Sequence, residues 1–235
     1  MRERVSEVGT VVIVMPALNE AAVIGTVLSK IPVRIDSYTT VPVVVDDGST
    51  DATGEIARRC GAYLLRHVTN LGVGAATITG LKAARQLDAD IIVTMDADGQ
   101  HDPAEIEPLV QCLIDGQFDV VIGSRLLSSN GMPPTRVMAN LLLNVVTFIV
   151  YRKIVSDSQS GFKVFSKAAL ASIDLNSSGY EICSEIIGEI YRKNLRYKSV
   201  PIRALYTKYS RAKGQHFLNG INLILGLFMR LMRRT

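Results

Sequence analysis

The chain has 235 residues, of which 48% are hydrophobic, so it can bury one large core. Its 26 Lys and Arg residues exceed its 22 Asp and Glu residues by only four, which argues against a nucleic-acid-binding protein. The three cysteines are far apart and lack metal-ligand spacing, so they indicate buried thiols in a reducing compartment. We expect no signal peptide, and no uncharged apolar run reaches the roughly 18 to 20 residues that cross a bilayer.

Strand, loop and helix patterns alternate five times within about the first 125 residues. Continuous β-branched runs predict strands that are buried on both faces, and each is followed by a polar loop and a helical pattern. Asn19 and Asp51 are expected to cap the first two helices. This alternation predicts a doubly wound, mostly parallel α/β sheet with helices on both faces. The expected strands are 10–15, 41–45, 62–66, 91–95 and 119–122, and the expected helices are 20–30, 52–60, 75–86 and 103–115.

The pattern changes after residue 125, where loops and apolar helices replace the regular alternation. The last helix is amphipathic and ends in arginines, so we expect one domain over residues 1–215 and a separate basic helix over 216–235. The elements expected here are an apolar helix over 137–151, a strand over 164–165, a helix over 180–192, a strand over 197–202, a basic stretch over 206–214 and the final helix over 216–234.

Two carboxylates follow the buried run 91–95, in the segment Asp96-Ala97-Asp98-Gly99-Gln100-His101. Ligands of open α/β sheets bind at the carboxyl ends of strands, and two carboxylates placed there repel each other unless a cation joins them. Oxygen ligands with an amide nearby favour Mg²⁺ or Mn²⁺ over zinc. The alternative is an acidic loop that only caps the next helix. We expect His101 to be a surface residue or a support for the ligands rather than a ligand itself.

Other polar groups fall at neighbouring strand ends, including Asp46, Asp47 and Arg125. The segment Asn70–Gly74 lacks the third glycine of a dinucleotide fingerprint and follows the third strand rather than the first. A tight loop whose backbone approaches a diphosphate or a base is the better interpretation. Several polar clusters on one sheet edge are therefore harder to explain as a solvated surface than as a binding site.

The sequence resembles the family 2 glycosyltransferases of the GT-A fold, and within them the polyprenyl-phosphate (dolichol-phosphate) mannosyl- or glucosyltransferases. The motifs occur in order between residues 10 and about 165, whereas the last 70 residues match only loosely. The segments that carry the resemblance are VMPALNE (14–20), VDDGSTD (45–51), NLGVGA (70–75), MDADGQ (95–100), GSR (123–125) and SGFK (160–163).

The resemblance implies roles for these residues. Asp96 and Asp98 would hold the divalent cation on the diphosphate, with Gln100 as a further ligand, and Arg125 would contact a donor or acceptor phosphate. The branch often has an aromatic residue where this chain has Leu18. The residues expected to contact substrate are Pro16, Leu18, Glu20, Asp46, Asp47, Asn70, Asp96, Ala97, Arg125, Lys163, Lys208 and Lys213, and the expected catalytic residues are Asp98, Arg125 and Asp157.

The nature of the acceptor decides whether the reaction needs a general base. A sugar hydroxyl needs one, whereas a lipid phosphate is already anionic and needs orientation and charge neutralisation. Arg125, Arg136 and Lys163 suit a phosphate, and Lys208 or Lys213 on a late basic loop could close over the donor. Asp157 and Glu185 are the candidate bases for a hydroxyl, although Asp157 could be a turn residue and Glu185 part of a solvated acidic face.

Two apolar segments bear on the location of the protein. The segments 137–151 and 217–232 are too short or too polar to cross a bilayer, but the second suits a helix lying on an anionic membrane surface. A core or oligomer-interface helix is the alternative. We expect a cytoplasmic protein that is peripheral on the cytoplasmic face of the membrane, with oligomers possible.

The leading hypothesis is a metal-dependent, inverting transfer of a hexose, with mannose favoured, from a nucleotide-sugar to a polyprenyl phosphate. Alternatives are UDP-glucose as donor, a sugar hydroxyl or glycerolipid as acceptor, and a membrane-docked scaffold with a vestigial site. A nucleotidyltransferase is disfavoured because the first strand leads into Pro16–Glu20 rather than a glycine-rich basic loop. The donor base and sugar, the exact lipid, the choice of Mn²⁺ or Mg²⁺ and the oligomeric state stay open.

Overall fold

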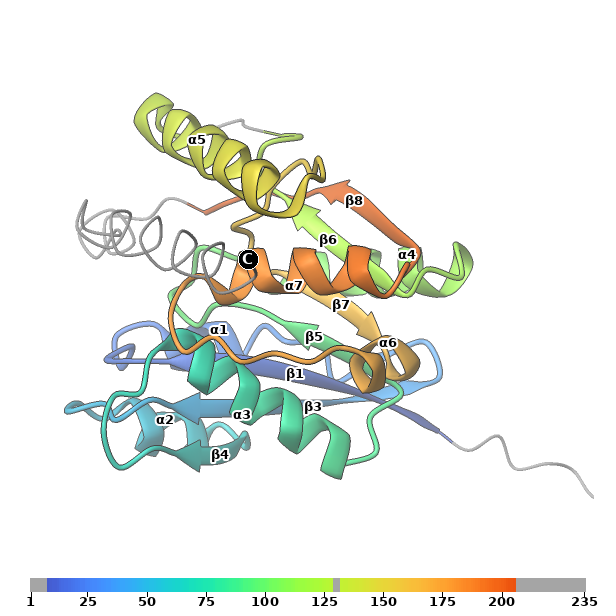
Figure 1. Cartoon of the computed structure of the whole chain (residues 1–235). Coiled ribbons are helices and arrows are strands. Elements are labelled where there is room, and N and C mark those ends of the chain that lie inside the picture. Colours follow the sequence, from blue (N-terminus) through green and yellow to red (C-terminus); the bar gives the residue numbers. More distant parts are fainter. Residues whose placement is uncertain (1–7, 129–131, 206–235) are drawn as a thin grey trace, which may run out of the picture.

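A central sheet of eight strands organises the computed structural model, which describes residues 8–128 and 132–205 (Figure 1). The strands are β1 (Gly9–Ala17), β2 (Arg34–Ile35), β3 (Tyr38–Asp46), β4 (Tyr63–Arg66), β5 (Ile91–Thr94), β6 (Val120–Ser124), β7 (Lys163–Ser166) and β8 (Tyr197–Pro201). The helices are α1 (Ile24–Leu28), α2 (Thr53–Arg59), α3 (Val73–Gln86), α4 (Ile106–Asp115) after the 3₁₀ turn η1 (Pro103–Glu105), α5 (Pro134–Tyr151), α6 (Lys167–Ser172) and α7 (Ile182–Arg192).

The sheet is mixed, with strand order β2-β3-β1-β5-β7-β6-β8 and β4 beside β3. Strands β1, β3, β4 and β5 are parallel, as are β6 and β8, whereas β7 runs antiparallel to both of its neighbours β5 and β6. Strand β7 therefore begins at the edge where β5 and β6 end. Its first residue, Lys163, pairs with Thr94 and with Ile122.

The side chains on the two faces of β1 belong to two separate hydrophobic cores, which explains the uninterrupted apolar sequence of this strand. Val11, Ile13 and Met15 pack with residues of α1 and α4, whereas Val12 and Val14 pack with residues of α3, α6 and α7. Successive side chains of a strand point to opposite faces, so a strand covered on both sides must be apolar throughout. The prediction of a mostly parallel α/β sheet with helices on both faces is confirmed.

The loop after β1 differs from the prediction. Asn19 does not cap a helix, because α1 begins only at Ile24 after the N-cap residue Val23. Asn19 instead has a φ of 53° and accepts a hydrogen bond from Thr50 N (2.9 Å). The side chain of Asn19 thus joins the loops that follow β1 and β3. Asp51 precedes Ala52, the N-cap residue of α2, so it does not occupy the expected cap position, although its Oδ1 accepts from Thr53 N (3.0 Å) in the first turn.

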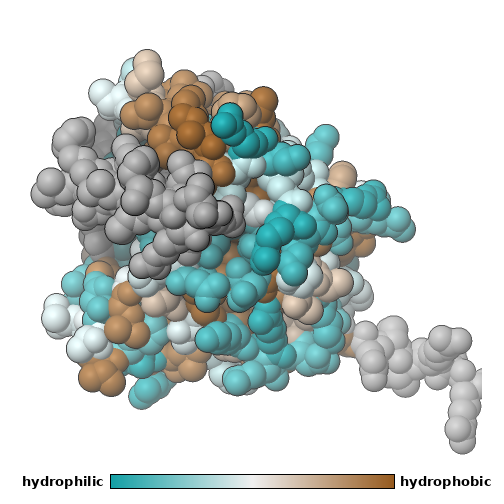
Figure 2. All heavy atoms as spheres, viewed as in Figure 1, coloured by the Kyte–Doolittle hydropathy of each residue, from teal (hydrophilic) through white to brown (hydrophobic). Residues whose placement is uncertain are grey.

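Helix α5 has an unusual distribution of polarity. Its outer face is apolar and exposed, with 68% exposure at Met138, 55% at Leu142 and 53% at Val145, and Figure 2 shows hydrophobic residues gathered over this helix. Its inner face carries the half-buried Asn144 and the fully buried Thr147. With 18 residues, α5 is longer than expected and meets the length and composition of a membrane-crossing helix. The expected helix at 216–235 lies outside the described residues.

Candidate active site

The polar residues at the strand ends converge on one edge of the sheet. Strands β1, β3, β5 and β6 end at this edge and β7 starts there, so the loops after the first four and before the fifth share one region (Figure 1). Carboxyl ends of parallel strands are the usual ligand-binding edge of open α/β sheets. The antiparallel insertion of β7 adds the segment before Lys163 to this edge.

Asp96 and Asp98 lie in the loop after β5. Asp98 accepts hydrogen bonds from the backbone N (2.9 Å) and side-chain Nε2 of Gln100, and the Gln100 Oε1 accepts from Arg136 Nη1 (3.1 Å) at the start of α5. Burial raises the pKa of Asp96 despite the opposing charges of Arg125 and Lys163. Burial and the charge of Asp96 raise the pKa of Asp98.

The Asp96 side chain is 41% exposed, so burial by itself does not call for a cation. The charge of Asp96 does disfavour ionisation of Asp98, and a cation shared by the two carboxylates would relieve this repulsion. The described residues contain no group of three or more His, Cys, Asp or Glu side chains that could hold a metal ion. Two carboxylates and an amide are nevertheless a donor set that suits Mg²⁺ or Mn²⁺, because such ions take their remaining ligands from water and substrate phosphates. The residues present therefore fit a divalent cation that is shared with a diphosphate.

His101 is buried beneath the Asp96 loop, with 1% exposure. Its Nδ1 accepts a hydrogen bond from Asp96 N (3.0 Å), its Nε2 lies 3.7 Å from Asp96 Oδ2, and its ring lies 5.0 Å from that of Phe162. Burial and the charge of Arg125 lower the pKa of His101 to about 4, so the imidazole is neutral near pH 7. His101 thus orients Asp96, in agreement with its expected supporting position.

Arg125 follows β6 and is fixed by Asp157. The guanidinium donates from Nε (2.8 Å) and Nη2 (2.9 Å) to the two carboxylate oxygens, and Arg125 N donates to Oδ2 (3.0 Å). Asp157 is fully buried. Burial alone would raise its pKa, but the charge and hydrogen bonds of Arg125 hold the pKa below its ordinary range. Asp157 is thereby an ionised partner of Arg125 near neutral pH, without the raised pKa typical of a general base.

Lys163 is a second cation at this edge, with 1% exposure. Its Nζ donates to the carbonyl of Ser160, and its charge lowers the pKa of both Asp96 and Asp157. The preceding Gly161 lies against Asp96, where an added Cβ would be 2.5 Å from the carboxylate Oδ1. The 160–163 segment therefore packs directly on the acidic loop, and only glycine fits at the contact.

Asp46 and Asp47 at the end of β3 differ in their surroundings. Asp47 accepts from His67 Nδ1 (2.6 Å), Leu71 N (3.0 Å) and Gly72 N (2.9 Å), so its oxygens are engaged by the protein. Asp46 Oδ1 accepts from Ser49 N (2.8 Å), and its buried Oδ2 lies 3.4 Å from Arg66 Nε in an ion pair, without a hydrogen-bond partner among the described residues. The carboxylates of Asp46 and Asp47 are thus both engaged by neighbouring side chains or backbone, and Asp46 is the less fully hydrogen-bonded of the two.

The glycines after Asn70 make a close packing contact. A Cβ at Gly74 would collide with the carbonyl of Ser177, and one at Gly72 with that of Ser178. Ala75 N donates to this Ser178 carbonyl (3.1 Å). The glycines allow the start of α3 to approach the 177–179 loop, and the approach of their backbone to a diphosphate or base stays a prediction. Asn70 itself is exposed and accepts from Gly72 N (3.0 Å).

The remaining residues expected in the donor site line the loops after β1 and β5. Pro16 is the penultimate residue of β1, Leu18 is half-buried, and Glu20 and Ala97 are buried. The backbone N–H of Glu20 donates to Thr53 Oγ1 (2.7 Å), and this hydrogen bond fixes the loop after β1 against the segment that follows β3. Lys208 and Lys213 lie outside the described residues.

Glu185 is not part of a solvated face, and the expectation of such a face is wrong. Its carboxylate is buried and accepts from Asn176 N (3.2 Å) and Ser177 N (2.9 Å), while Glu189, also buried, accepts from Asp174 N (3.1 Å). These carboxylates of α7 tie down the loop before the helix. This loop leads to Tyr180, which the sequence reasoning did not single out and which is 40% exposed.

Tyr180 lies near the acidic loop although it comes from the other end of the chain. Burial raises the pKa of its phenol, and the charges of Asp96, Asp98 and Glu20 raise it further. Its signal in the sequence is slight, because one tyrosine before a helix is not distinctive. The sequence reasoning also missed His67, which binds Asp47, because a single histidine is equally undistinctive in the sequence.

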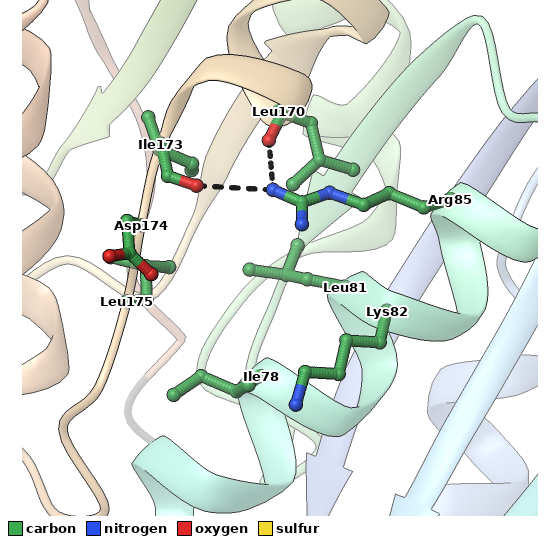
Figure 3. A pocket seen from close by; sticks show the side chains of 8 residues that line it. All are labelled: Ile78, Leu81, Lys82, Arg85, Leu170, Ile173, Asp174 and Leu175. Carbon is green, nitrogen blue, oxygen red and sulfur yellow. Dashed lines mark hydrogen bonds between the residues drawn. The ribbon is translucent and has the colours of Figure 1, made fainter.

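A cavity of about 70 Å³ lies elsewhere, between α3 and α6 (Figure 3). The Arg85 guanidinium donates to the carbonyls of Leu170 and Ile173 (3.1 Å to the latter) at the end of α6. Basic side chains commonly satisfy the last carbonyls of a helix. This cavity lies around the C-terminal end of α6, which Arg85 caps. It is remote from the strand ends that carry the acidic loop.

Comparisons with known proteins identify the family. The profile of "Glycosyl transferase family 2" matches residues 12–173, and the chain belongs to this family. An uncharacterized protein of Methanocaldococcus jannaschii is 39% identical over 223 residues, which are 93% of this chain and 90% of that protein. The chain is therefore a glycosyltransferase, and the predicted family is confirmed.

Two further relatives have names that state an activity. The UDP-N-acetylglucosamine–dolichyl-phosphate N-acetylglucosaminyltransferase of Methanococcus voltae is 36% identical over 95% of this chain and 96% of its own. The dolichol-phosphate mannosyltransferase of Pyrococcus furiosus is 31% identical over 88% of this chain, which spans 59% of that protein. A glucosyl-3-phosphoglycerate synthase of Mycobacterium tuberculosis, solved with Mn²⁺ and uridine diphosphate, superposes with a TM-score of 0.71 at 21% identity, covering 96% of this chain and 80% of its own. This likeness confirms the GT-A fold.

Proposed function

We propose that this enzyme is a metal-dependent, inverting glycosyltransferase that moves a hexose from a nucleotide-sugar to a polyprenyl phosphate. The observation that carries the proposal is the placement, on one sheet edge, of two neighbouring carboxylates, Asp96 and Asp98, and an arginine that Asp157 holds in a fixed position. The carboxylates suit a cation-bound diphosphate, and the arginine suits a second phosphate. The names of the two polyprenyl-phosphate relatives support the same acceptor class.

The donor would bind over the loops after β1, β3 and β5. Asp96, Asp98 and Gln100 would hold Mn²⁺ or Mg²⁺, which when bound neutralises negative charge that accumulates on the leaving diphosphate. His101 keeps Asp96 directed at this position through its hydrogen bond to the backbone. Asp46, beside Arg66 at the end of β3, would bind the base or ribose, and Asp47 would act through the loop that it anchors.

The acceptor phosphate would bind toward Arg125 and Lys163, with Arg136 at the start of α5. A phosphate oxygen attacks the anomeric carbon, the bond from that carbon to the diphosphate oxygen breaks, and its electron pair leaves with the diphosphate. No proton has to be removed from the phosphate. The two candidate bases agree with this, because the Asp157 carboxylate is hydrogen-bonded to Arg125 and the Glu185 carboxylate to backbone amides. We therefore assign Asp157 to positioning Arg125 rather than to proton transfer.

The transferred sugar and the base of the nucleotide donor form a separate part of the proposal. Our preference for mannose is supported by the name of the mannosyltransferase relative, whereas the more similar named relative is a UDP-N-acetylglucosamine enzyme. A thermal-shift panel of GDP, UDP and their sugars, each with and without Mn²⁺, decides between them. The matching nucleotide will stabilise the protein only with the cation, and the Asp98→Ala variant will lose this dependence. A shift that is equal in wild type and variant would contradict the proposed metal site.

The membrane surface is the proposed location, on the cytoplasmic side. A polyprenyl tail must stay in the bilayer while its phosphate reaches Arg125, and α5 extends from this region with its apolar stripe outward. Exposed apolar stripes of this kind bind membrane interfaces or partner proteins. We expect the outer face of α5 to lie in the interface, because its inner face is hydrogen-bonded to the domain.

A further inference from the structure

The inner face of α5 reaches the arginine clamp through one side chain. Asn144 Nδ2 donates to the carbonyl of Ser156 (2.9 Å), and Asn144 Oδ1 accepts from Ser158 N (2.8 Å). These backbone groups stand on either side of Asp157. An amide is suited to this task because it presents one donor and one acceptor group, which match a carbonyl and an N–H.

The same loop is secured from a second direction. Thr147, one turn further along α5, is fully buried and hydrogen-bonds to Ser184 Oγ of α7 (2.9 Å) and to Ser158 Oγ (3.2 Å). Gln159 Nε2 donates to both of these serine hydroxyls, at 3.1 Å to Ser158 and 2.9 Å to Ser184. The 156–159 segment is thus held between α5 and α7 by side-chain hydrogen bonds, with Asp157 at its centre.

The position of Arg125 then depends on α5. Asp157 is fully buried and takes three hydrogen bonds from Arg125, so the direction of the guanidinium follows that of the carboxylate. Asn144 brackets the backbone of Asp157 and fixes the carboxylate in turn. Asparagine is a poor residue for a helix interior, so these tertiary hydrogen bonds give a physical reason for its presence in α5.

We propose that Asn144 is a positioning residue of the transfer reaction. From α5, the helix whose outer face is apolar, Asn144 holds Asp157 in place, and Asp157 in turn holds the Arg125 guanidinium. The inference rests on the proposed function, in which Arg125 binds the acceptor phosphate. Asn144 contacts neither substrate in this account. Its loss alters the acceptor half of the site and spares the donor half, which is built on the loops after β1, β3 and β5.

The test compares Asn144→Leu with Asn140→Leu in the full chain. Leucine has a similar volume and makes neither hydrogen bond. Asn140 is a matched control one turn earlier on α5, since its amide contacts a sulfur among the described residues, at 4.0 Å to Met132 Sδ, and does not hold the 156–158 backbone. We expect Asn144→Leu to lower kcat/KM for polyprenyl phosphate by about 10- to 100-fold, because small misplacements of a binding group cost about this much. The affinity for the nucleoside diphosphate with Mn²⁺ should stay within about twofold in both variants, and kcat/KM should be unchanged in Asn140→Leu.

A second readout does not depend on the acceptor. In ¹⁵N-arginine-labelled protein, the Nε–H signal of Arg125, assigned by its loss in Arg125→Lys, should exchange slowly with water in wild type. Asn144→Leu should shift it and speed its exchange, whereas Asn140→Leu should leave it as in wild type. An unchanged Arg125 signal in Asn144→Leu overturns the inference. A changed signal without any transfer to polyprenyl phosphate by the wild type overturns the proposed function instead.

The more conservative Asn144→Asp carries the same test if the leucine variant does not fold. It keeps an acceptor for Ser158 N, loses the donor to Ser156, and adds a negative charge beside Asp157. We expect a smaller loss of kcat/KM than in Asn144→Leu and a shifted Arg125 signal. Wild-type values for both quantities in Asn144→Asp would also overturn the proposed role.

Discussion

The ion pair between Arg125 and Asp157 gives a sharp prediction for stability. Replacing Asp157 with Asn removes the negative charge and leaves a guanidinium, 15% exposed, without its partner. Loss of one partner of a buried pair typically costs about 3–5 kcal/mol in the free energy of unfolding. For a chain of this size each kcal/mol corresponds to roughly 2–4 °C, so the melting temperature should fall by about 6–20 °C.

The matched control is Asp88→Asn, which removes an ion pair of similar length on the surface. Asp88 Oδ1 lies 2.7 Å from Lys167 Nζ, but the two side chains are 83% and 53% exposed. Surface pairs contribute at most about 1 kcal/mol, so this variant should melt within a few degrees of wild type. Thermal unfolding followed by circular dichroism measures both variants under one condition.

The effect should also depend on pH with a defined sign. The pKa of Asp157 is lower in the folded chain than its ordinary value of 3.8, because burial, which raises it, is outweighed by the charge and hydrogen bonds of Arg125 together with the charge of Lys163. Its contribution to stability is therefore complete above that value and is lost as the pH falls through the folded pKa. The gap between wild type and Asp157→Asn should be largest near neutral pH and narrow below 3.8. Equal melting of Asp157→Asn and Asp88→Asn at neutral pH would refute the reasoning.

Three other variants test separate parts of the structure. His101→Ala should weaken Mn²⁺ binding measured by calorimetry by about 10- to 100-fold, because the imidazole accepts from Asp96 N and orients that ligand. Gly74→Ala should lower the free energy of unfolding by about 1–3 kcal/mol in denaturant titrations, since the new methyl meets the Ser177 carbonyl. Leu142→Glu should weaken co-sedimentation with anionic vesicles about tenfold or more, because it removes one exposed apolar side chain of α5 and adds a repelled charge.

Each of these has an outcome that contradicts it. Wild-type Mn²⁺ affinity in His101→Ala would show that Asp96 does not need the imidazole. Unchanged stability of Gly74→Ala would show that the 177–179 loop yields to the added methyl. The control for Leu142→Glu is Leu87→Glu, which changes an exposed leucine at the end of α3. Equal vesicle binding by the two leucine variants would remove α5 from the membrane contact.

The sequence predicted the parallel half of the fold because local signals are strong there. Buried strands such as β1 and β5 are continuous β-branched runs, and each ends at a polar loop. The order of strands in space leaves no such local trace. The insertion of β7 between β5 and β6 depends on long-range packing, and with it comes the 156–162 segment that supplies Asp157 and packs on Asp96.

The sequence motifs indicated which side chains lie at the site better than they indicated the role of each side chain. Asp96, Asp98 and Arg125 were expected from their motifs at strand ends, and the structure brings them to one edge. The burial of Glu185 could not be predicted, because three acids at helical spacing suggest a solvated face until the amides of the 174–177 loop are seen to meet them. The glycines at 72 and 74 likewise needed their tertiary neighbours to be explained.

The acceptor is the central claim, and one comparison of two lipids tests it most directly. The enzyme, in vesicles with Mn²⁺ and its preferred nucleotide-sugar, is offered a polyprenyl phosphate or the polyprenol of the same length. A site that neutralises an anionic acceptor with Arg125 and holds both candidate bases in hydrogen bonds should glycosylate the phosphate and leave the alcohol unchanged. Transfer to the polyprenol at a comparable rate, or to neither lipid while the donor still binds, would contradict the account.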